Sequence, residues 1–160
     1  MDNMILLGWR EWLSLPELGL PCIAAKIDTG AKSSCLHTFQ IDPFERDGQV
    51  WVRFGVHPVQ NDNDIVVWRE APVKDQREVS DSGGHKELRY VIETTAQIGN
   101  ESRLIEMTLT NRDSMRFRML LGRTAMNGLC VVNPALSWCL GELDASTLAS
   151  QKEAWRAEAD

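Results

Sequence analysis

The chain has 160 residues, of which 43% are hydrophobic and 25% are charged, and its formal net charge is −6. This length favours one domain with a hydrophobic core over two independent domains. The negative net charge argues against nucleic acid as a partner, although it does not exclude a local basic patch. No apolar run approaches the roughly 20 residues that would span a membrane.

The N-terminal residues 1–7 are apolar but lack the basic segment and the long apolar segment of a signal peptide. We interpret them as the start of a first strand and expect a cytoplasmic protein. Four cysteines lie among apolar residues and none forms a C-x-x-C pair, which favours reduced thiols in the core. They are Cys22, Cys35, Cys130 and Cys139.

Short runs of apolar or alternating residues, separated by Gly, Pro, Asn and Asp, indicate β-strands. In chain order, we expect extended segments at residues 5–9, 22–27, 34–41, 50–56, 64–73, 88–98, 104–109 and 117–121. The pair Gly99-Asn100 predicts a hairpin between two of them. Closely spaced strands of this kind predict an all-β fold, either a barrel or a sandwich.

Two helical segments are expected within this β-rich chain. A short turn at residues 123–127 is followed, near the end of the sequence, by a helix that Asp144 or Ser146 can cap. Because this second helix carries many charges, we expect it at the periphery. The predicted division is therefore residues 1–143 as the main domain and residues 144–160 as a helical tail.

Residues 25–31, with the sequence AKIDTGA, deliver one carboxylate to the end of an apolar strand. Thr29 adds a hydroxyl that can brace the turn, Gly30 permits backbone conformations closed to other residues, and Ala31 adds little bulk. Such a loop presents the acid, Asp28, in a crowded place. An Asp beside a Gly is also a common turn residue, so a purely structural role stays open.

Peptide hydrolysis by aspartate needs two carboxylates that share one proton. Two like charges close together cannot both ionise cheaply, so one carboxyl keeps its proton while the other is ionised. The ionised carboxylate takes a proton from water, and the protonated one donates to the scissile carbonyl. Asp-Thr-Gly occurs once in the sequence, so a second copy of the chain must supply the second acid if this chemistry is present.

A second motif lies at residues 119–123, with the sequence MLLGR. In this order, the two motifs resemble the retropepsin superfamily, in which an apolar-apolar-Gly segment passes beneath the Asp-Thr-Gly loop. The Leu-Leu-Gly-Arg form, followed by a short helix, is similar to that of the retroviral enzymes. The resemblance implies a closed acid-protease barrel in which further residues support the loop or the substrate. These residues are Ala31, Lys32, Leu121, Gly122 and Arg123.

Three segments together resemble a narrower, bacterial retropepsin-like family. They are residues 8–13, 25–37 and 120–124. That family was long named ATP-dependent zinc protease, because of its association with an ATP-grasp ligase that modifies ribosomal protein tails. The resemblance implies a homodimer with one Asp28 from each chain, and an ATP-grasp ligase as a candidate partner. It also implies that Thr29 braces the paired loops and that Gly30 offers backbone groups to a peptide substrate.

Two features depart from the retroviral pattern. Lys32 replaces the acidic residue that pairs with the arginine of Gly-Arg in the viral enzymes, so that ion pair with Arg123 is absent. The two motifs are also farther apart than in the viral enzymes, and we therefore expect additional loops or strands. Gly83 and Gly84 lie in a turn at residues 80–85, which is either a mobile flap over the site or a plain surface turn.

The three histidines, His37, His57 and His85, are widely separated in the sequence. Cys35 and His37 can place two zinc ligands on one face of a strand, but no third or fourth ligand is evident. We expect no metal and no other cofactor. The sequence also lacks a P-loop, so any ATP dependence would come from a partner.

The favoured function is an aspartic endopeptidase that acts on a peptide or protein substrate as a homodimer. One alternative is a non-catalytic peptide-binding module on the same barrel, in which Lys26, Lys32 and Arg123 bind an acidic peptide. The other alternative is a zinc-dependent protease, as the older family name suggests.

Overall fold

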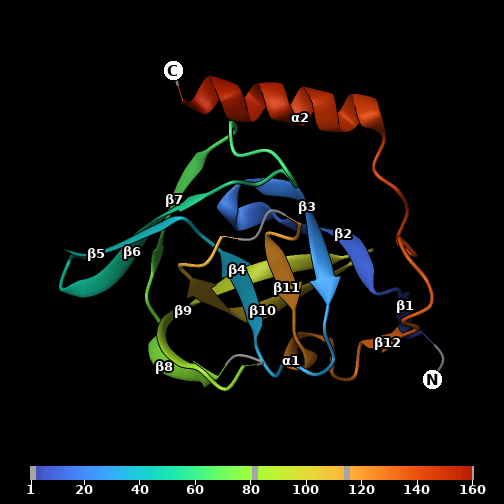
Figure 1. Ribbon diagram of the computed structural model, residues 1–160, viewed down its shortest axis with the longest axis horizontal. Helices are drawn as coiled ribbons and strands as arrows, with labels where there is room; N and C mark the ends of the chain where they lie inside the picture. Colours follow the sequence, from blue (N-terminus) through green and yellow to red (C-terminus); the bar gives the residue numbers. More distant parts are fainter. Residues whose placement is uncertain (1–2, 81–82, 114–115, 160) are drawn as a thin grey trace.

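The computed structural model describes residues 3–80, 83–113 and 116–159, in which the chain forms twelve strands, two α-helices and one short 3-10 helix (Figure 1). The strands are β1 (Ile5–Leu7), β2 (Arg10–Leu15), β3 (Leu20–Ile27), β4 (Ser34–His37), β5 (Gln40–Arg46), β6 (Gln49–Val56), β7 (Val67–Pro72), β8 (Asp75–Ser80), β9 (Lys86–Ile98), β10 (Glu101–Thr110), β11 (Met119–Leu121) and β12 (Cys130–Val132). The helices are η1 (Pro16–Leu18), α1 (Arg123–Met126) and α2 (Ala145–Glu158). None of these helices is long and apolar enough to cross a membrane.

Six of the strands form a closed barrel. Their order around the ring is β10-β4-β11-β3-β2-β9, and β9 pairs with β10 to complete it. The pairs β3 with β11 and β4 with β10 are parallel, and the other pairs of the ring are antiparallel. The prediction of an all-β, closed barrel with a short helix after Gly122 is confirmed.

The barrel separates an apolar interior from a polar outer face because successive side chains of a strand point to opposite sides. In β10, the residues Ile105, Met107 and Leu109 belong to the hydrophobic core. The intervening Glu106 and Thr108 line a cleft on the outside of the same strand. One strand therefore contributes both to the core and to the surface on which the candidate site lies.

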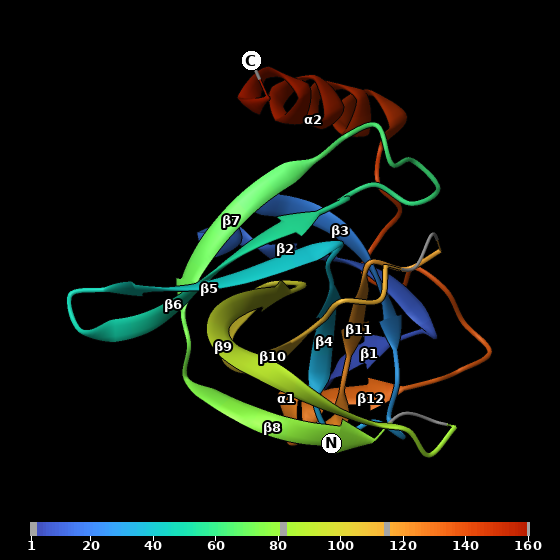
Figure 2. The same ribbon diagram turned by 60° about the vertical axis from the view of Figure 1, so that its left-hand side comes forward.

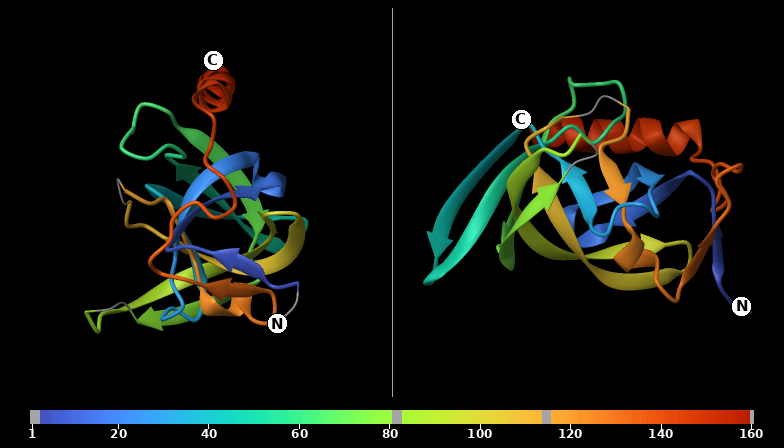
Figure 3. Two further views of the ribbon diagram at one scale, coloured as in Figure 1. Left: turned by 90° about the vertical axis from the view of Figure 1, so that its right-hand side faces the viewer. Right: turned by 60° about the horizontal axis from the view of Figure 1, so that its bottom comes forward.

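An antiparallel sheet of β5, β6 and β7 lies between β4 and β8 in the sequence. Its β5–β6 hairpin extends away from the barrel in Figures 2 and 3. The predicted continuous strand at residues 34–41 is wrong here, because β4 ends at His37 and β5 begins at Gln40. Between them, the backbone N–H of Thr38 donates to the Thr110 carbonyl at 2.9 Å, and the chain then leaves the barrel.

Three strands, β2, β8 and β12, are missing from the sequence-based prediction. In β2 a carboxylate, Glu11, occupies an inward position and is 0% exposed. It accepts hydrogen bonds from the backbone N–H groups of Gly8 (2.6 Å), Cys139 (2.9 Å) and Leu140 (3.0 Å). These bonds compensate for its burial among apolar residues. β8 is almost wholly polar, and β12 is a short parallel partner of β1.

The four cysteines are free thiols, but they do not all lie in the core. Cys22 and Cys35 are buried, as predicted. Cys130 is only half-buried, and Cys139 is exposed, which contradicts the prediction of a core position. The backbone of Cys139 is nevertheless fixed, because its N–H and that of Leu140 donate to the Glu11 carboxylate at 2.9 and 3.0 Å.

Helix α2 lies outside the barrel, at the top of Figure 1. The carboxylate of Asp144 accepts a hydrogen bond from the Ser146 N–H at 3.0 Å and caps the helix. Trp155 nevertheless belongs to the hydrophobic core and is 1% exposed. Its indole N–H donates to the carbonyl of Gly19 at 3.2 Å. The helix is therefore peripheral in position but contributes one large side chain to the core.

Candidate active site

Asp28 lies directly after β3, where the strand leaves the barrel. Its backbone N–H donates to the carbonyl of Leu121 at 2.9 Å, which ties the turn to β11. Its carboxylate accepts a hydrogen bond from the N–H of Gly30 at 2.9 Å, and its carbonyl accepts one from Ala31 at 3.3 Å. The half-buried side chain of Asp28 is thus held by the turn that the Asp-Thr-Gly sequence forms.

The second motif passes against this turn, so residues far apart in the sequence meet. The N–H of Gly122 donates to the hydroxyl of Ser34 at 3.0 Å. A Cβ atom at position 122 would lie 2.5 Å from the carbonyl carbon and oxygen of Ser33. No side chain larger than hydrogen fits there without displacing the backbone, which explains the glycine.

The start of α1 fixes the far side of the turn. The backbone N–H of Arg123 donates to the Ala31 carbonyl at 2.7 Å, and the N–H and hydroxyl of Thr124 donate to the Lys32 carbonyl at 3.1 and 2.9 Å. The guanidinium of Arg123 donates to the carbonyl of Thr29 at 3.0 Å. Arg123 therefore binds the backbone of the Asp28 loop through both its N–H and its guanidinium.

A cleft of about 890 Å³ opens beside Asp28. One side is the loop itself, with Gly30, Ala31, Lys32 and Ser33. The floor is the outer face of the barrel, with Cys35, His37, Thr108, Thr110 and Leu120. The opposite side is the β8–β9 hairpin, with Arg77, Glu78, Val79, Ser80 and Arg89, and further residues are Glu106 and Arg112.

The glycines of the predicted flap lie in the turn between β8 and β9, where Ser80 pairs with Lys86. Residues 81–82 of that turn lie outside the described residues. Gly84 adopts a φ of +83° and has no atom within 4 Å of a Cβ built on it. Gly83 and Gly84 are not among the residues that line the cleft, whereas β8 itself is.

Ion pairs hold the hairpin to the outer face of the barrel. The guanidinium of Arg77 forms two bonds to the carboxylate of Glu106, at 2.7 and 2.8 Å, and Lys74 lies 3.1 Å from the same carboxylate. The Arg77 hydrogen bonds, aided by Lys74, lower the pKa of Glu106 to about 2. Arg89 bonds to Glu87 at 3.1 Å. The cleft therefore holds several cations, and ion pairs with carboxylates fix Arg77 and Arg89 in place.

The sequence did not single out Arg77, Arg89, Glu106 or Arg112. A weak signal exists in β10, where Glu106 and Thr108 alternate with core residues and so mark a strand face that is polar but not fully exposed. Arg77 lies in a strand that the apolar pattern does not reveal. Only the pairing of β8 with β9 brings this residue to the Asp28 cleft.

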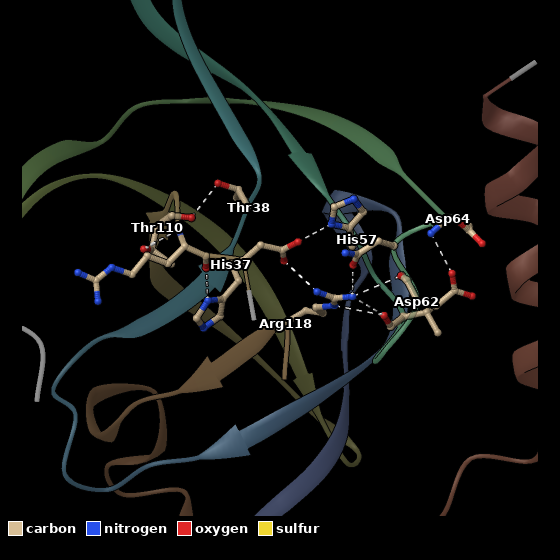
Figure 4. Close-up of polar contacts among 11 residues, drawn as sticks. His37, Thr38, His57, Asp62, Asp64, Thr110 and Arg118 are labelled. Atoms are coloured by element: carbon tan, nitrogen blue, oxygen red, sulfur yellow. Dashed lines mark hydrogen bonds and ion pairs between the residues drawn. The ribbon is translucent and has the colours of Figure 1, made fainter. Parts of the chain in front are cut away.

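The sites suggested for zinc make other contacts. Nδ1 of His37 lies 2.5 Å from the Arg112 carbonyl, and Nδ1 of His57 lies 2.5 Å from the carboxylate of Asp113 (Figure 4). Burial raises the pKa of the Cys35 thiol, which keeps it protonated at neutral pH. Among the residues that the structure describes, no group of three or more His, Cys, Asp or Glu side chains is arranged to hold a metal ion.

Comparisons with known proteins relate nearly the whole chain to one family. Residues 6–141 match the RimB-like family model, described as retropepsin-like aspartic endopeptidase RimB. A protein from Parasynechococcus marenigrum, named probable alpha-L-glutamate ligase, is 49% identical over 158 residues, which cover 99% of this chain and 34% of that protein. A protein of the same name from Shewanella pealeana is 47% identical over 141 residues, covering 88% and 31%. The chain thus spans about a third of the length of these curated relatives.

A solved structure has a similar fold. The crystal structure of the protein Lpg0085 from Legionella pneumophila, described as of unknown function, aligns with a TM-score of 0.68 and 28% sequence identity. The alignment covers 85% of this chain and 98% of that one.

Proposed function

The chain belongs to the family of the retropepsin-like aspartic endopeptidase RimB, and from that premise we propose that it hydrolyses peptide bonds with water activated by two Asp28 carboxylates, one from each of two chains. The observation that carries the proposal is the position of Asp28. Its turn is fixed by Leu121 and Gly30, and it borders a cleft of about 890 Å³. This volume falls within the range that is typical of ligand-binding clefts.

The chemistry requires the second chain. A lone carboxylate at neutral pH accepts a proton but has none to donate, whereas two adjacent carboxylates retain one proton between them. The ionised Asp28 would deprotonate the attacking water, and the protonated Asp28 of the other chain would donate to the carbonyl oxygen of the peptide. The Gly30 N–H, bonded to Oδ1 of Asp28, would keep the plane of each carboxylate fixed during this exchange.

The β8–β9 hairpin is the part of the chain best placed to cover a bound peptide. Residues of β8 line the cleft opposite the Asp28 loop, and Gly83 and Gly84 lie at the turn of the hairpin. We infer that this hairpin is the flap. The ligand-facing part of the flap is then β8 with its ion pair between Arg77 and Glu106, rather than the two glycines.

The test of the catalytic proposal is Asp28→Asn, which keeps the size of the side chain and removes its ionisation. We expect cleavage of a proteome-derived peptide library to fall by about a thousandfold or more, while the fold and the dimer persist. Asp42→Asn is the matched control, because Asp42 is exposed on β5, outside the cleft. Full activity of the Asp28→Asn protein would contradict the mechanism.

Two further measurements separate the proposal from its alternatives. Sedimentation equilibrium should give a dimer under the conditions of the cleavage assay, because a strictly monomeric yet active protein has no second Asp28. EDTA should leave cleavage unchanged, whereas loss of activity on chelation, restored by zinc, would favour the metalloprotease named in the older family description.

A second candidate function is a peptide-binding module that serves a ligase. It is favoured by the name of the relatives, probable alpha-L-glutamate ligase, and by their length, about three times that of the matched region. The cations Lys32, Arg89 and Arg112 in the cleft also favour it. Such a module would bind its peptide equally well as Asp28→Asn and would cleave nothing. For either function, we propose a glutamate ligase of the ATP-grasp type as a partner and the cytoplasm as the compartment.

A further inference from the structure

The connection between β10 and β11, residues 111–118, borders the cleft at Arg112, and we call it the cleft wall. Residues 114–115 of this connection lie outside the described residues. Arg112 lines the cleft beside Asp28, and Arg116 and Phe117 line a second cavity of about 310 Å³. The two cavities share His37 and Leu120. The position of this connection therefore influences the shape of both cavities.

The wall is held from outside the cleft by a buried arginine. Arg118 is 0% exposed, and its guanidinium donates to the carbonyl of Val59 at 3.1 and 3.2 Å and to that of Asp62 at 3.3 Å. It also donates to the side-chain oxygen of Asn63 at 2.8 Å and to Oδ1 of Asp113 at 2.9 Å. Figure 4 shows these contacts converging on Arg118 from two directions.

The carboxylate of Asp113 contacts one side chain within the wall, Arg118, and one outside it, His57. Oδ1 contacts Arg118, and Oδ2 lies 2.5 Å from Nδ1 of His57. The His57 ring is itself stacked on Phe39, with ring centroids 4.4 Å apart. A Cβ at Gly55 would lie 2.3 Å from the Phe39 ring, so this ring packs directly on the backbone of β6. The ring of His57 is thus held by contacts that do not involve the wall.

Val59, Asp62 and Asn63, together with His57, all belong to the connection between β6 and β7, residues 57–66. We call this segment the brace. It has its own internal structure, because Val59 and Asp62 form a β-bridge and the Asp64 N–H donates to the Asp62 carboxylate at 2.9 Å. The internal contacts of the brace therefore orient its carbonyl groups towards Arg118, and this orientation does not depend on contacts with the wall.

The brace also contacts the wall beyond Arg118. The side-chain amide of Gln60 donates to the Arg116 carbonyl. From the barrel side, His37 contacts the carbonyl of Arg112, and burial lowers the pKa of His37, so that its ring is neutral at pH 7. Arg112 and Asp113, which are adjacent in sequence, are thereby held by two histidines from different elements.

We propose that the brace positions the cleft wall for substrate binding, with His57 of the brace and Arg118 of the wall as the positioning residues. A buried guanidinium is stable only while its hydrogen bonds are made. Any displacement of Asp113 leaves part of the Arg118 and His57 hydrogen bonding unsatisfied. The wall is consequently restricted to one position, and the sheet of β5, β6 and β7, which carries the brace, is coupled to the cleft.

The kinetic part of this inference rests on the proposed function, while the positioning itself does not. His57→Leu removes the contact to Asp113 without touching the cleft, because His57 is not among its lining residues. We expect amide hydrogen exchange at Arg112 and Asp113 to accelerate by roughly tenfold, because the variant loses one hydrogen bond to a charged group and the local structure opens more often. Exchange in β3 and β11 should stay unchanged.

For a peptide that the wild type cleaves, His57→Leu should raise KM by about fivefold with little change in kcat, because binding rather than chemistry is affected. His57→Gln retains a donor and should recover most of the loss. Glu70→Gln is the matched control, since it removes a surface ion pair with Arg46 (3.2 Å) from the same sheet.

The outcomes are distinct. Unchanged exchange at Arg112 and Asp113 in the His57→Leu protein overturns the positioning role, as does equal acceleration in Glu70→Gln or throughout the barrel. A fall in kcat with unchanged KM overturns the assignment to substrate binding. If the wild type cleaves no peptide, the endopeptidase proposal fails, and the exchange measurement still decides the role of the brace.

Discussion

The carboxylate of Glu11 contacts both the start of the barrel and the segment before α2. It is fully buried on β2 and accepts three backbone N–H bonds, from Gly8, Cys139 and Leu140. Two of these donors lie at the other end of the chain. The carboxylate thus adds to the backbone hydrogen bonds that hold this C-terminal segment, in which the Trp9 N–H donates to Leu136 at 2.8 Å and the Trp138 N–H donates to Arg10 at 3.0 Å.

We expect Glu11→Gln to lower the free energy of unfolding by about 2 kcal/mol, because an amide has one acceptor oxygen and turns an NH₂ group towards a backbone donor. Urea unfolding measures the change. Glu17→Gln is the matched control, since the exposed Glu17 carboxylate accepts a backbone N–H bond from Thr95 at 2.6 Å. This variant should lower the free energy of unfolding much less than Glu11→Gln. Equal losses for the two variants would show that the burial of Glu11 adds nothing.

At the scale of the element, the apolar pattern predicted those strands that have one buried face. β6 is the clearest case, because Val52, Phe54 and Val56 are all 0% exposed. The pattern fails where the inner face is not apolar, as at Glu11 in β2. It also fails in β8, which pairs with β9 as an extension of the sheet and buries none of its residues completely.

β9 pairs with β10 in the barrel, whereas the β8 side of the hairpin is tied to β10 by ion pairs. Arg77 and Lys74 both contact the Glu106 carboxylate, at 2.7 and 3.1 Å. The pKa of Glu106 is lowered to about 2, from about 4.3 in an unfolded chain. A carboxyl with a lowered pKa in the folded state stabilises the fold above its unfolded pKa and loses that contribution as the pH falls through its folded pKa.

Glu106→Gln should therefore destabilise the protein at pH 7. We expect a loss of only roughly 1 kcal/mol, because the carboxylate is partly exposed and solvent screens its ion pairs. The difference between wild type and variant should shrink between pH 4.5 and pH 2, as the wild-type carboxylate takes up its proton. Urea unfolding at a series of pH values measures this difference. A gap that stays constant down to pH 2 would mean that the charge of Glu106 does not contribute.

At the scale of the whole molecule, the sequence predicted what is encoded in short motifs and missed what is assembled from distant parts. The loop around Asp28 and the Gly122 segment were each visible, and their order suggested their contact. The cleft wall could not be predicted, because its position depends on contacts between two connections that are far apart in the sequence, Asp113 and Arg118 in one and His57 in the other. No periodicity links such residues, and each alone has the composition of an ordinary loop.

The tail was predicted as a separate segment, residues 144–160, because its charge suggested a solvated helix. The structure shows two anchors that tie α2 to the rest of the molecule. Trp155 is buried in the common core and donates to Gly19. Arg69 of β7 binds Glu158 at 2.7 Å, and its guanidinium also donates to the carbonyl of Leu18.

We expect Trp155→Ala to lower the free energy of unfolding by about 3–4 kcal/mol, since removal of a buried indole leaves a cavity beside Gly19. It also removes one of the two hydrogen bonds to the Gly19 carbonyl, the other being donated by Arg69 at 3.3 Å. Arg156→Ala is the matched control, because Arg156 is exposed on the same helix and alanine favours helix; its effect should stay within about 0.5 kcal/mol. Urea unfolding followed by fluorescence and by circular dichroism should give one coincident transition for both proteins. If Trp155→Ala is as stable as the control, α2 is an appendage that the barrel does not need. A single large loss would instead make the barrel and its C-terminal helix one cooperative unit.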